Sequence, residues 1–208
     1  TRRSSDLFQA RALSQKVNTR ARNHACVEKY RELGGGKAVV FCVDVAHAQD
    51  MAAAFETQGI ESHCVVGQTD PQIRRETLMA FHQALVKRHL VLTNCMVLSE
   101  GWDCPSVKME IMARPTRSEI VYIQQLGRGL RPAPGKDKVI VVDIADHYGR
   151  GLCNCLHNVY QLDQNVLLEG DIEATLTQRQ KRLFAGEAAA EEQELAKLSL
   201  QLTDILFS

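Results

Sequence analysis

The sequence predicts an α/β fold in which a doubly wound, mainly parallel sheet carries helices on both of its faces. Short runs rich in β-branched residues recur from Lys37 onward, and stretches with helical spacing separate them. The composition agrees, because 45% hydrophobic and 24% charged residues over 208 positions are typical of one large or two small globular domains. No apolar run approaches the length of a membrane span.

A basic helical segment precedes the first predicted strand. Apolar spacing from Leu7 to Cys26 predicts one or two helices, which the three glycines at 34–36 end. Residues 1–31 hold eight basic residues against Asp6 and Glu28, although the whole chain balances 25 basic against 25 acidic residues. The balance excludes a strongly basic nucleic-acid binder, so only a local basic surface could bind nucleic acid.

Five strands are expected, at 38–43, 60–66, 89–93, 107–112 and 138–144. Asp70 and Pro71 mark the start of a helix that should run to about Val86, because aspartate is a favoured N-cap and proline fits the first helical position. Ligands of parallel sheets bind beyond the carboxyl ends of the strands. The loops after Val43, Val66, Thr93 and Ala113 are therefore the expected places for a site.

The strand signals fade after residue 146, and 183–207 is predicted to be a polar helical tail. We expect three parts: a basic helical segment at 1–36, the sheet domain at 37–150 and a helical extension at 151–208. The last 23 residues hold five acidic residues against Lys197. We interpret the charged ends as solvated helix faces; the alternative is that they attract each other or meet different partners.

Seven cysteines without a secretory segment favour reduced thiols and a cytoplasmic protein, associated with the nucleoid if the source is bacterial. A start at Thr1 rather than Met indicates a fragment or a processed chain. Cys153, Cys155 and His157 lack Cys-x-x-Cys spacing and a second ligand pair, so no metal site is expected there.

The glycines at 34–36 followed by Lys37 briefly resemble a phosphate-binding loop. Such a loop needs a helix opened by Lys-Ser/Thr, whereas here Ala38 and a predicted strand follow the lysine. We therefore predict a flexible connector. Asp143 is interpreted as an ordinary strand-end aspartate, because Ile144 follows where a catalytic acid would stand.

The segment at 124–131 is the most informative about chemistry. Gln124, Gly127, Arg128 and Arg131 are spaced i, i+3, i+4 and i+7, which places them on one face of a helix. Two guanidinium groups on one face repel each other unless an anion lies opposite, and phosphate is the natural candidate. The alternative is an exposed arginine-rich helix end before Pro132, where cations favour the helix dipole.

A second cluster follows the strand that ends at Thr93. At 100–105 an acid stands beside glycine, which suits a ligand rich in hydroxyl groups. The alternative is an ordinary turn stopped by Pro105. For Trp102, packing in the core is favoured over stacking on a base.

Together these segments resemble the second RecA-like lobe of superfamily-2 helicases and translocases, over roughly 37–144. Residues 38–47 resemble helicase motif IV, 93–105 motif V and 124–131 motif VI of the Q-x-x-G-R-x-x-R type. Gly67, Thr69, Arg74 and Phe81 follow motif IV at family-like spacing. The segments at 114–116 and 135–136 are similar to bacterial DEAD/DEAH-box repair helicases of the RadD kind and to type III restriction helicase subunits.

The resemblance implies roles for individual residues. Arg131 would be the arginine finger that reaches the γ-phosphate of ATP, with Arg128 beside it and Gln124 orienting the network. Gly101, Asp103 and Gly127 would lie at the nucleotide. Contacts to the nucleic-acid backbone would come from or near Phe41, His47, Gly67, Thr69, Arg74 and Thr93. For His47, a polar helix cap is the alternative.

The first RecA-like lobe, in the same or a partner chain, would carry the main ATP and Mg²⁺ ligands, so hydrolysis by this chain alone is not expected. DNA is the expected substrate, in repair or restriction, and no membrane role is expected. One alternative is a non-catalytic nucleic-acid or protein binding module that keeps a helicase-like lobe. An unrelated nucleotide binder would need a glycine-rich loop after the first strand, and 43–46 has none.

Overall fold

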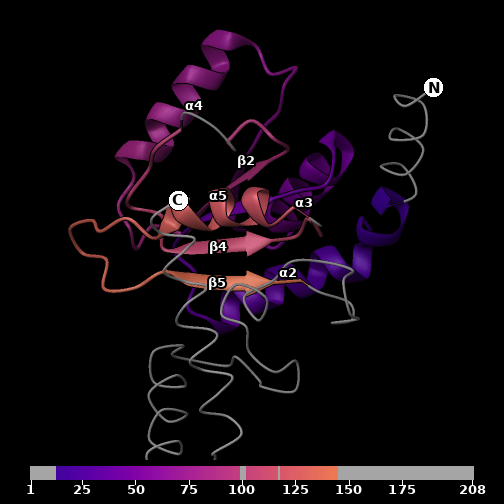
Figure 1. The fold of residues 1–208 in the computed structure, drawn as a ribbon, viewed down its shortest axis with the longest axis horizontal. Coiled ribbons are helices and arrows are strands. Elements are labelled where there is room, and N and C mark those ends of the chain that lie inside the picture. The colour runs from indigo at the N-terminus through magenta and orange to yellow at the C-terminus, as the bar shows by residue number, and fades with distance from the viewer. Residues whose placement is uncertain (1–12, 99–101, 117, 145–208) are drawn as a thin grey trace, which may run out of the picture. The chain divides into compact units, whose positions relative to one another are not determined.

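In the part of the chain that the structure describes, five parallel strands form one sheet, in the order β2-β3-β1-β4-β5 (Figure 1). The structure is a computed structural model that describes residues 13–98, 102–116 and 118–144. The strands are β1 (Lys37–Phe41), β2 (Glu61–Val65), β3 (Leu90–Asn94), β4 (Met109–Met112) and β5 (Ile140–Asp143). The predicted fold class is confirmed, and each strand begins and ends within two residues of its prediction.

The last residues of the strands meet at one edge of the sheet. Phe41 pairs with both Asn94 and Met112, Val65 pairs with Asn94, and Met112 pairs with Asp143. The three central strands are fully buried, as expected for a parallel sheet covered on both faces.

Four helices have described bounds: α2 (Arg20–Glu32), α3 (Val45–Thr57), α4 (Pro71–Gln83) and α5 (Glu119–Gly129). The side chains of Thr19, Asp44, Asp70 and Ser118 cap them by accepting first-turn N–H groups. α4 starts at the predicted residue but ends three residues before Val86, because Ala84 turns to an extended conformation. The ammonium of Lys37 binds the carbonyls of His82 and Ala84 at this end.

The helices cover both faces of the sheet. α3 packs on β2 and β3, and α2 packs on α3. Right-handed connections between parallel strands place α4 and α5 on the opposite face, since their strands advance across the sheet in the opposite direction. Tyr30 of α2 packs edge-on against Phe55 of α3, with ring centroids 5.3 Å apart. α2, which lies in the predicted N-terminal helical segment, therefore contributes to the same core as the sheet.

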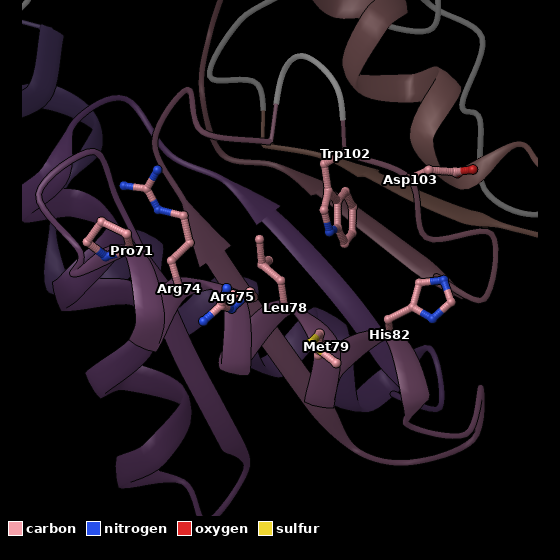
Figure 2. Close-up of a pocket in the computed structure, with 8 residues that line it drawn as sticks. All are labelled: Pro71, Arg74, Arg75, Leu78, Met79, His82, Trp102 and Asp103. Atoms are coloured by element: carbon pink, nitrogen blue, oxygen red, sulfur yellow. The ribbon is translucent and has the colours of Figure 1, made fainter.

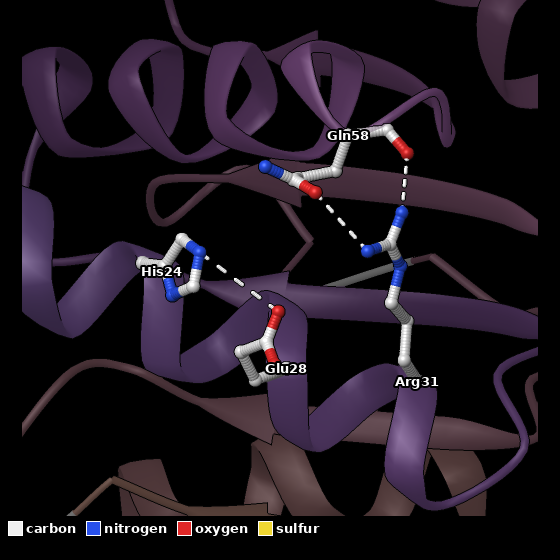
Figure 3. A network of polar contacts seen from close by, with 4 residues as sticks. All are labelled: His24, Glu28, Arg31 and Gln58. Atoms are coloured by element: carbon white, nitrogen blue, oxygen red, sulfur yellow. Dashed lines mark hydrogen bonds and ion pairs between the residues drawn. The ribbon is translucent and has the colours of Figure 1, made fainter.

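Some basic residues of the N-terminal segment hold helices in place. Arg31 donates to the side chain of Gln58 at 3.0 Å and to its backbone carbonyl at 2.6 Å, which ties the end of α2 to the end of α3 (Figure 3). His24 and Glu28 lie 3.8 Å apart along α2 in the same view.

The glycines at 34–36 form a close-packed turn rather than the flexible connector that we expected. All three have positive φ, at 82°, 53° and 106°. The hydroxyl of Tyr30 donates to the carbonyl of Gly36 at 2.7 Å and accepts its N–H at 3.1 Å. A side chain at Gly35 would meet the ring of His89 at 2.5 Å. Lys37 is buried and opens β1, so a strand follows the glycines, as predicted.

Among the described residues, no helix combines the length and the apolar character needed to cross a membrane. The same ranges contain no group of three or more histidine, cysteine, aspartate or glutamate side chains placed to hold a metal ion. Gly101, the cysteines and histidine at 153–157, and the predicted tail lie outside the described residues.

Candidate functional site

The predicted motif at 124–131 begins inside α5 and ends beyond it. Gln124, Gly127 and Arg128 are helical, whereas Arg131 lies two residues after the last helical residue. The expectation of a single helical face is therefore correct for three of these residues and wrong for Arg131. The physical reason is Pro132, because a proline disfavours the helical conformation of the residue before it.

Three cations from this part of the chain hold the segment at 102–105. Arg128 donates through Nη1 to the carbonyl of Trp102 at 2.5 Å. Arg131 Nη1 lies 2.5 Å from Asp103 Oδ2. Lys136 donates through Nζ to the carbonyl of Pro105 at 2.8 Å. The structure thus brings Arg128 and Arg131 to the same short segment, which carries Asp103.

The Arg131–Asp103 pair faces solvent. The two side chains keep 51% and 52% of their surface exposed. An exposed ion pair contributes little to stability, so its partners can exchange for a ligand at low cost. A guanidinium released in this way can bind phosphate in a bidentate manner, and the freed carboxylate can accept bonds from hydroxyl groups.

The two glycines of the motif differ in their surroundings. Gly129 is buried against β4, where a Cβ would lie 2.7 Å from Cδ of Glu110. Gly127 faces open space, with nothing within 4 Å of such an atom. Gly129 therefore permits the close approach of α5 to the sheet, and Gly127 leaves room beside Arg128.

A buried acid lies beneath this end of α5. Glu110 is fully buried in β4, and burial raises its pKa well above the usual value. The backbone of Gly129 and the cations Lys136 and Arg128 oppose this shift. Burial also lowers the pKa of Lys136, while Glu110 raises it. Sequence reasoning missed both residues as members of this site.

The cluster lies at the amino edge of the sheet, and not beyond the carboxyl ends where we expected a site. β4 and β5 are parallel, so α5 must run from the carboxyl edge back to the amino edge between them. Pro105 precedes β4 and Lys136 precedes β5, which places their contact at the amino edge. The general rule for parallel sheets does not describe this cluster, because its arginines come from the end of a helix and not from a loop that follows a strand.

Two of the residues predicted to contact nucleic acid, Gly67 and Thr69, lie in the loop after β2, and a third, Arg74, lies in the first turn of α4. Arg74 Nη2 donates to the carbonyls of Val66, Gly67 and Thr69 at 2.9, 2.8 and 3.3 Å. Thr69 Oγ1 accepts the N–H of Val66 at 2.9 Å. Arg74 therefore shapes this loop, and Gly67 remains exposed on it.

The other three residues of that set have buried side chains. Phe41 and His47 are 1% exposed, and Thr93 is fully buried with its hydroxyl bonded to the carbonyl of Ala48 at 2.8 Å. His47 accepts the N–H of Val43 through Nδ1 at 3.4 Å, and burial lowers its pKa. These side chains expose almost no surface to a nucleic-acid strand. A contact at these three positions would therefore have to come from the neighbouring backbone.

A hollow of about 420 Å³ lies between α4 and the segment at 102–103 (Figure 2). Its lining comprises Pro71, Arg74, Arg75, Leu78, Met79, His82, Trp102 and Asp103. The ring of Trp102 points toward α4 and lies 6.0 Å from the ring of Phe81, while Asp103 points away from it. Trp102 therefore packs against Phe81, and its side chain also lines the hollow.

Comparison with known proteins identifies the family of this chain. Residues 21–133 match the sequence profile of a family described as the helicase conserved C-terminal domain. The chain belongs to this family. The resemblance to the second RecA-like lobe of a superfamily-2 helicase is thereby confirmed.

Relatives of known name agree with the family. The chain is 31% identical over 144 residues to "Putative ATP-dependent helicase IRC3" of Saccharomyces cerevisiae, a match that covers 67% of this chain and 20% of that protein. It therefore spans about a fifth of the length of this relative. The specific likeness to RadD-like and type III restriction helicases stays a prediction.

Two solved structures share the fold. One is a fragment titled as a "putative HsdR subunit of a type I restriction enzyme" from Vibrio vulnificus, with a TM-score of 0.54, 25% identity, and coverage of 66% of this chain and 28% of that one. The other is the C-terminal domain of the DEAD-box protein Dbp5, with a TM-score of 0.50, 20% identity, and coverage of 62% and 73%.

Proposed function

We propose that this chain is the C-terminal motor lobe of an ATP-dependent nucleic-acid helicase or translocase, and that Arg131 is its arginine finger. The observation that carries the proposal is the cluster of Arg131, Arg128 and Asp103 at the end of α5, within a helicase C-terminal domain. The cluster combines guanidinium groups for phosphate with a carboxylate for sugar hydroxyls, and its outer pair is half exposed.

The proposal assigns different parts of ATP binding to two lobes. ATP would lie between this lobe and a first RecA-like lobe, in the same or a partner chain, which would hold Mg²⁺ and most of the phosphate. ATP supplies the phosphoryl group that is transferred to water. Arg131 would exchange Asp103 for the γ-phosphate and stabilise the charge that develops there. Asp103, once released, would accept bonds from the ribose.

The remaining predicted residues take supporting parts. Arg128 holds the backbone at Trp102 and thereby the segment that carries Asp103. Gln124 is exposed on α5, where it can reach a ligand of the opposite lobe. The loop fixed by Arg74 would bind the backbone of a DNA strand, a largely sequence-independent contact that suits a motor moving along the strand.

The alternative function is a non-catalytic module that binds nucleic acid or protein. The hollow beside Trp102, with Arg74 and Arg75 in its lining, is the feature that favours it. A module of this kind needs neither a first lobe nor an arginine finger, so the two functions make opposite predictions for Arg131.

Turnover of ATP in the full-length protein tests the proposal. The wild type and Arg131→Ala are compared at saturating nucleic acid, with Arg31→Ala as a control because it removes the same charge from α2 on the other face of the sheet. Loss of an arginine finger typically costs about 10³ to 10⁵ in rate. We expect a loss of that order for Arg131→Ala with nucleic-acid binding retained, and nearly full activity for Arg31→Ala.

Two results would contradict the proposal. Turnover of Arg131→Ala within a few-fold of the wild type removes the finger role. A full-length protein that has no first lobe and needs no partner chain, and that binds nucleic acid without hydrolysing ATP, supports the binding module instead.

A further inference from the structure

Lys136 is bound to three backbone carbonyl groups from two separate parts of the chain. Its ammonium donates to Pro105 at 2.8 Å, to Arg131 at 3.0 Å and to Gly129. An ammonium group carries three protons, so these acceptors use all of its donor capacity. A phosphate-binding role for Lys136 would require breaking this set, which makes direct contact with a ligand the weaker interpretation.

Two of these carbonyls lie at the end of α5 and in the turn directly after it. The last carbonyls of a helix have no partner within the helix and carry the negative end of its dipole. Gly129 is the last residue of α5, and Arg131 stands in the turn that Pro132 prevents from being helical. Helical bonds therefore do not fix the backbone of Arg131, whereas the ammonium of Lys136 contacts it directly.

The third carbonyl, that of Pro105, lies in the segment that carries Asp103, the other member of the ion pair. Pro105 lies two residues after Asp103, in the segment whose carbonyl at Trp102 is also held by Arg128. One side chain thus contacts the backbone near both members of the Arg131–Asp103 pair. Lys136 therefore links the backbone on the Arg131 side of the pair to the backbone on the Asp103 side.

The charge of Lys136 strengthens this link. Lys136 is partly buried, and the buried side chain of Glu110 lies close enough to stabilise its charged form. Bonds from a charged donor to carbonyl groups are stronger than bonds between neutral groups, and more so away from water.

We infer that Lys136 is a positioning residue that holds Arg131 and Asp103 at the separation needed to meet the γ-phosphate and the ribose of one nucleotide. The inference rests on the proposed function. Lys136 itself touches neither ATP nor the strand. A misplacement of about 1 Å can lower a rate by about 10²-fold, and this is the loss expected when the link is removed.

Steady-state ATP turnover of the full-length protein tests the inference. The variants are Lys136→Met, Lys136→Arg, Arg131→Ala and the double variant Lys136→Met with Arg131→Ala. Lys138→Met is the control, because it removes a charge from an exposed residue two positions away. Thermal unfolding of each variant separates loss of structure from loss of positioning.

The expected pattern is specific to a residue that acts through Arg131. Lys136→Met should lower kcat by about 10 to 10²-fold with KM for ATP changed much less. Lys136→Arg should recover part of that loss, because it restores the charge and several donors. The double variant should be no slower than Arg131→Ala alone, since residues that act as a unit are not additive. Lys138→Met should resemble the wild type.

Failure of the inference differs from failure of the proposed function. An active Arg131→Ala variant refutes the proposed function. A severe loss in Arg131→Ala, together with wild-type kcat in Lys136→Met or a further loss in the double variant, refutes the inference alone. If Lys136→Met does not fold, Lys136→Arg measured with and without Arg131→Ala gives the same comparison, and a loss that multiplies in that pair refutes the inference.

Discussion

Alanine at Gly127 and at Gly129 should change the stability of the chain in opposite directions, although the two positions are separated by one residue in α5. Neither glycine has a positive φ, so neither conformation requires glycine. At Gly127 an added Cβ meets nothing within 4 Å. At Gly129 it would lie 2.7 Å from Glu110 Cδ, 2.7 Å from Val139 Cγ2 and 2.9 Å from Glu110 Oε2.

The size of each effect follows from these distances. Glycine inside a helix costs about 0.5 to 1 kcal/mol relative to alanine, so Gly127→Ala should raise the free energy of unfolding by up to about that amount. Overpacking of a filled core costs about 1 to 3 kcal/mol. Glu110 is fully buried and cannot retreat toward solvent, so Gly129→Ala should lose about 1 to 2 kcal/mol net.

Urea unfolding followed by circular dichroism measures both variants against the wild type. Thermal midpoints should move by about 2 to 4 °C per kcal/mol for a chain of this size, upward for Gly127→Ala and downward for Gly129→Ala. Trp102 is the single tryptophan of the chain, and its carbonyl is bound by Arg128, so its fluorescence reports displacement of this helix end. The emission should shift in Gly129→Ala and stay unchanged in Gly127→Ala.

A Gly129→Ala variant as stable as Gly127→Ala would refute the reasoning. That result would mean that α5 does not approach β4 as closely as the contacts with Glu110 require. The arrangement of Arg128, Arg131 and Lys136 around the same helix end would then lose its structural basis.

Three further predictions concern buried hydrogen bonds, a helix cap and pH. Tyr30→Phe removes both bonds to Gly36 and should cost about 1 to 3 kcal/mol in urea unfolding. Burial raises the pKa of Tyr30 to about 12, above its unfolded value, so the stability it contributes is lost as pH rises from about 10 to 12; Tyr30→Phe should lack this loss. Thr93→Val removes the bond from the buried hydroxyl to the carbonyl of Ala48 and should cost about 0.5 to 1.5 kcal/mol. Unchanged stability together with weaker nucleic-acid binding would instead indicate a direct strand contact. Asp70→Ala should lower the unfolding free energy by about 1 kcal/mol and Asp70→Asn by much less, because asparagine is an equally favoured cap.

The sheet could be predicted from the sequence because its strands are short β-branched runs separated by clear helix signals. Asp70 before Pro71 fixed the start of α4 for the same local reason. The early end of α4 could not be predicted, since it involves Lys37, which lies 45 residues from His82 in the chain. Local patterns contain no information about such a distant partner.

The residues predicted to contact nucleic acid show a different limit of prediction from sequence. Phe41 and Thr93 stand in central strands that are buried on both faces, so no alternation of polar and apolar residues separates inward from outward positions there. Family spacing identified these positions but could not reveal that their side chains are enclosed. By contrast, the departure of Arg131 from the helix was predictable, because Pro132 follows it in the sequence.

Lys136 illustrates what sequence reasoning cannot reach in a site of this type. Its acceptors are backbone carbonyl groups, which every residue possesses, so no residue pattern marks the interaction. Only the return of α5 to the amino edge of the sheet brings Pro105 and Arg131 within reach of one ammonium group. The backbone of Arg131, which carries the last arginine of the motif, is thus bound by a residue outside the motif.

The chain between β3 and β4 connects the two regions in which the proposed function places its ligands. It leaves the carboxyl edge after Asn94, which is tied to β1 by a bond from its side chain to the carbonyl of Val40 at 3.0 Å. Because β3 and β4 are parallel, it must reach the amino edge before Met109, and it carries Asp103 on the way. If Arg131 exchanges Asp103 for phosphate, as proposed, the backbone on both sides of Asp103 stays bound, at Trp102 by Arg128 and at Pro105 by Lys136. The exchange would therefore change the partner of the carboxylate without releasing the segment that carries it.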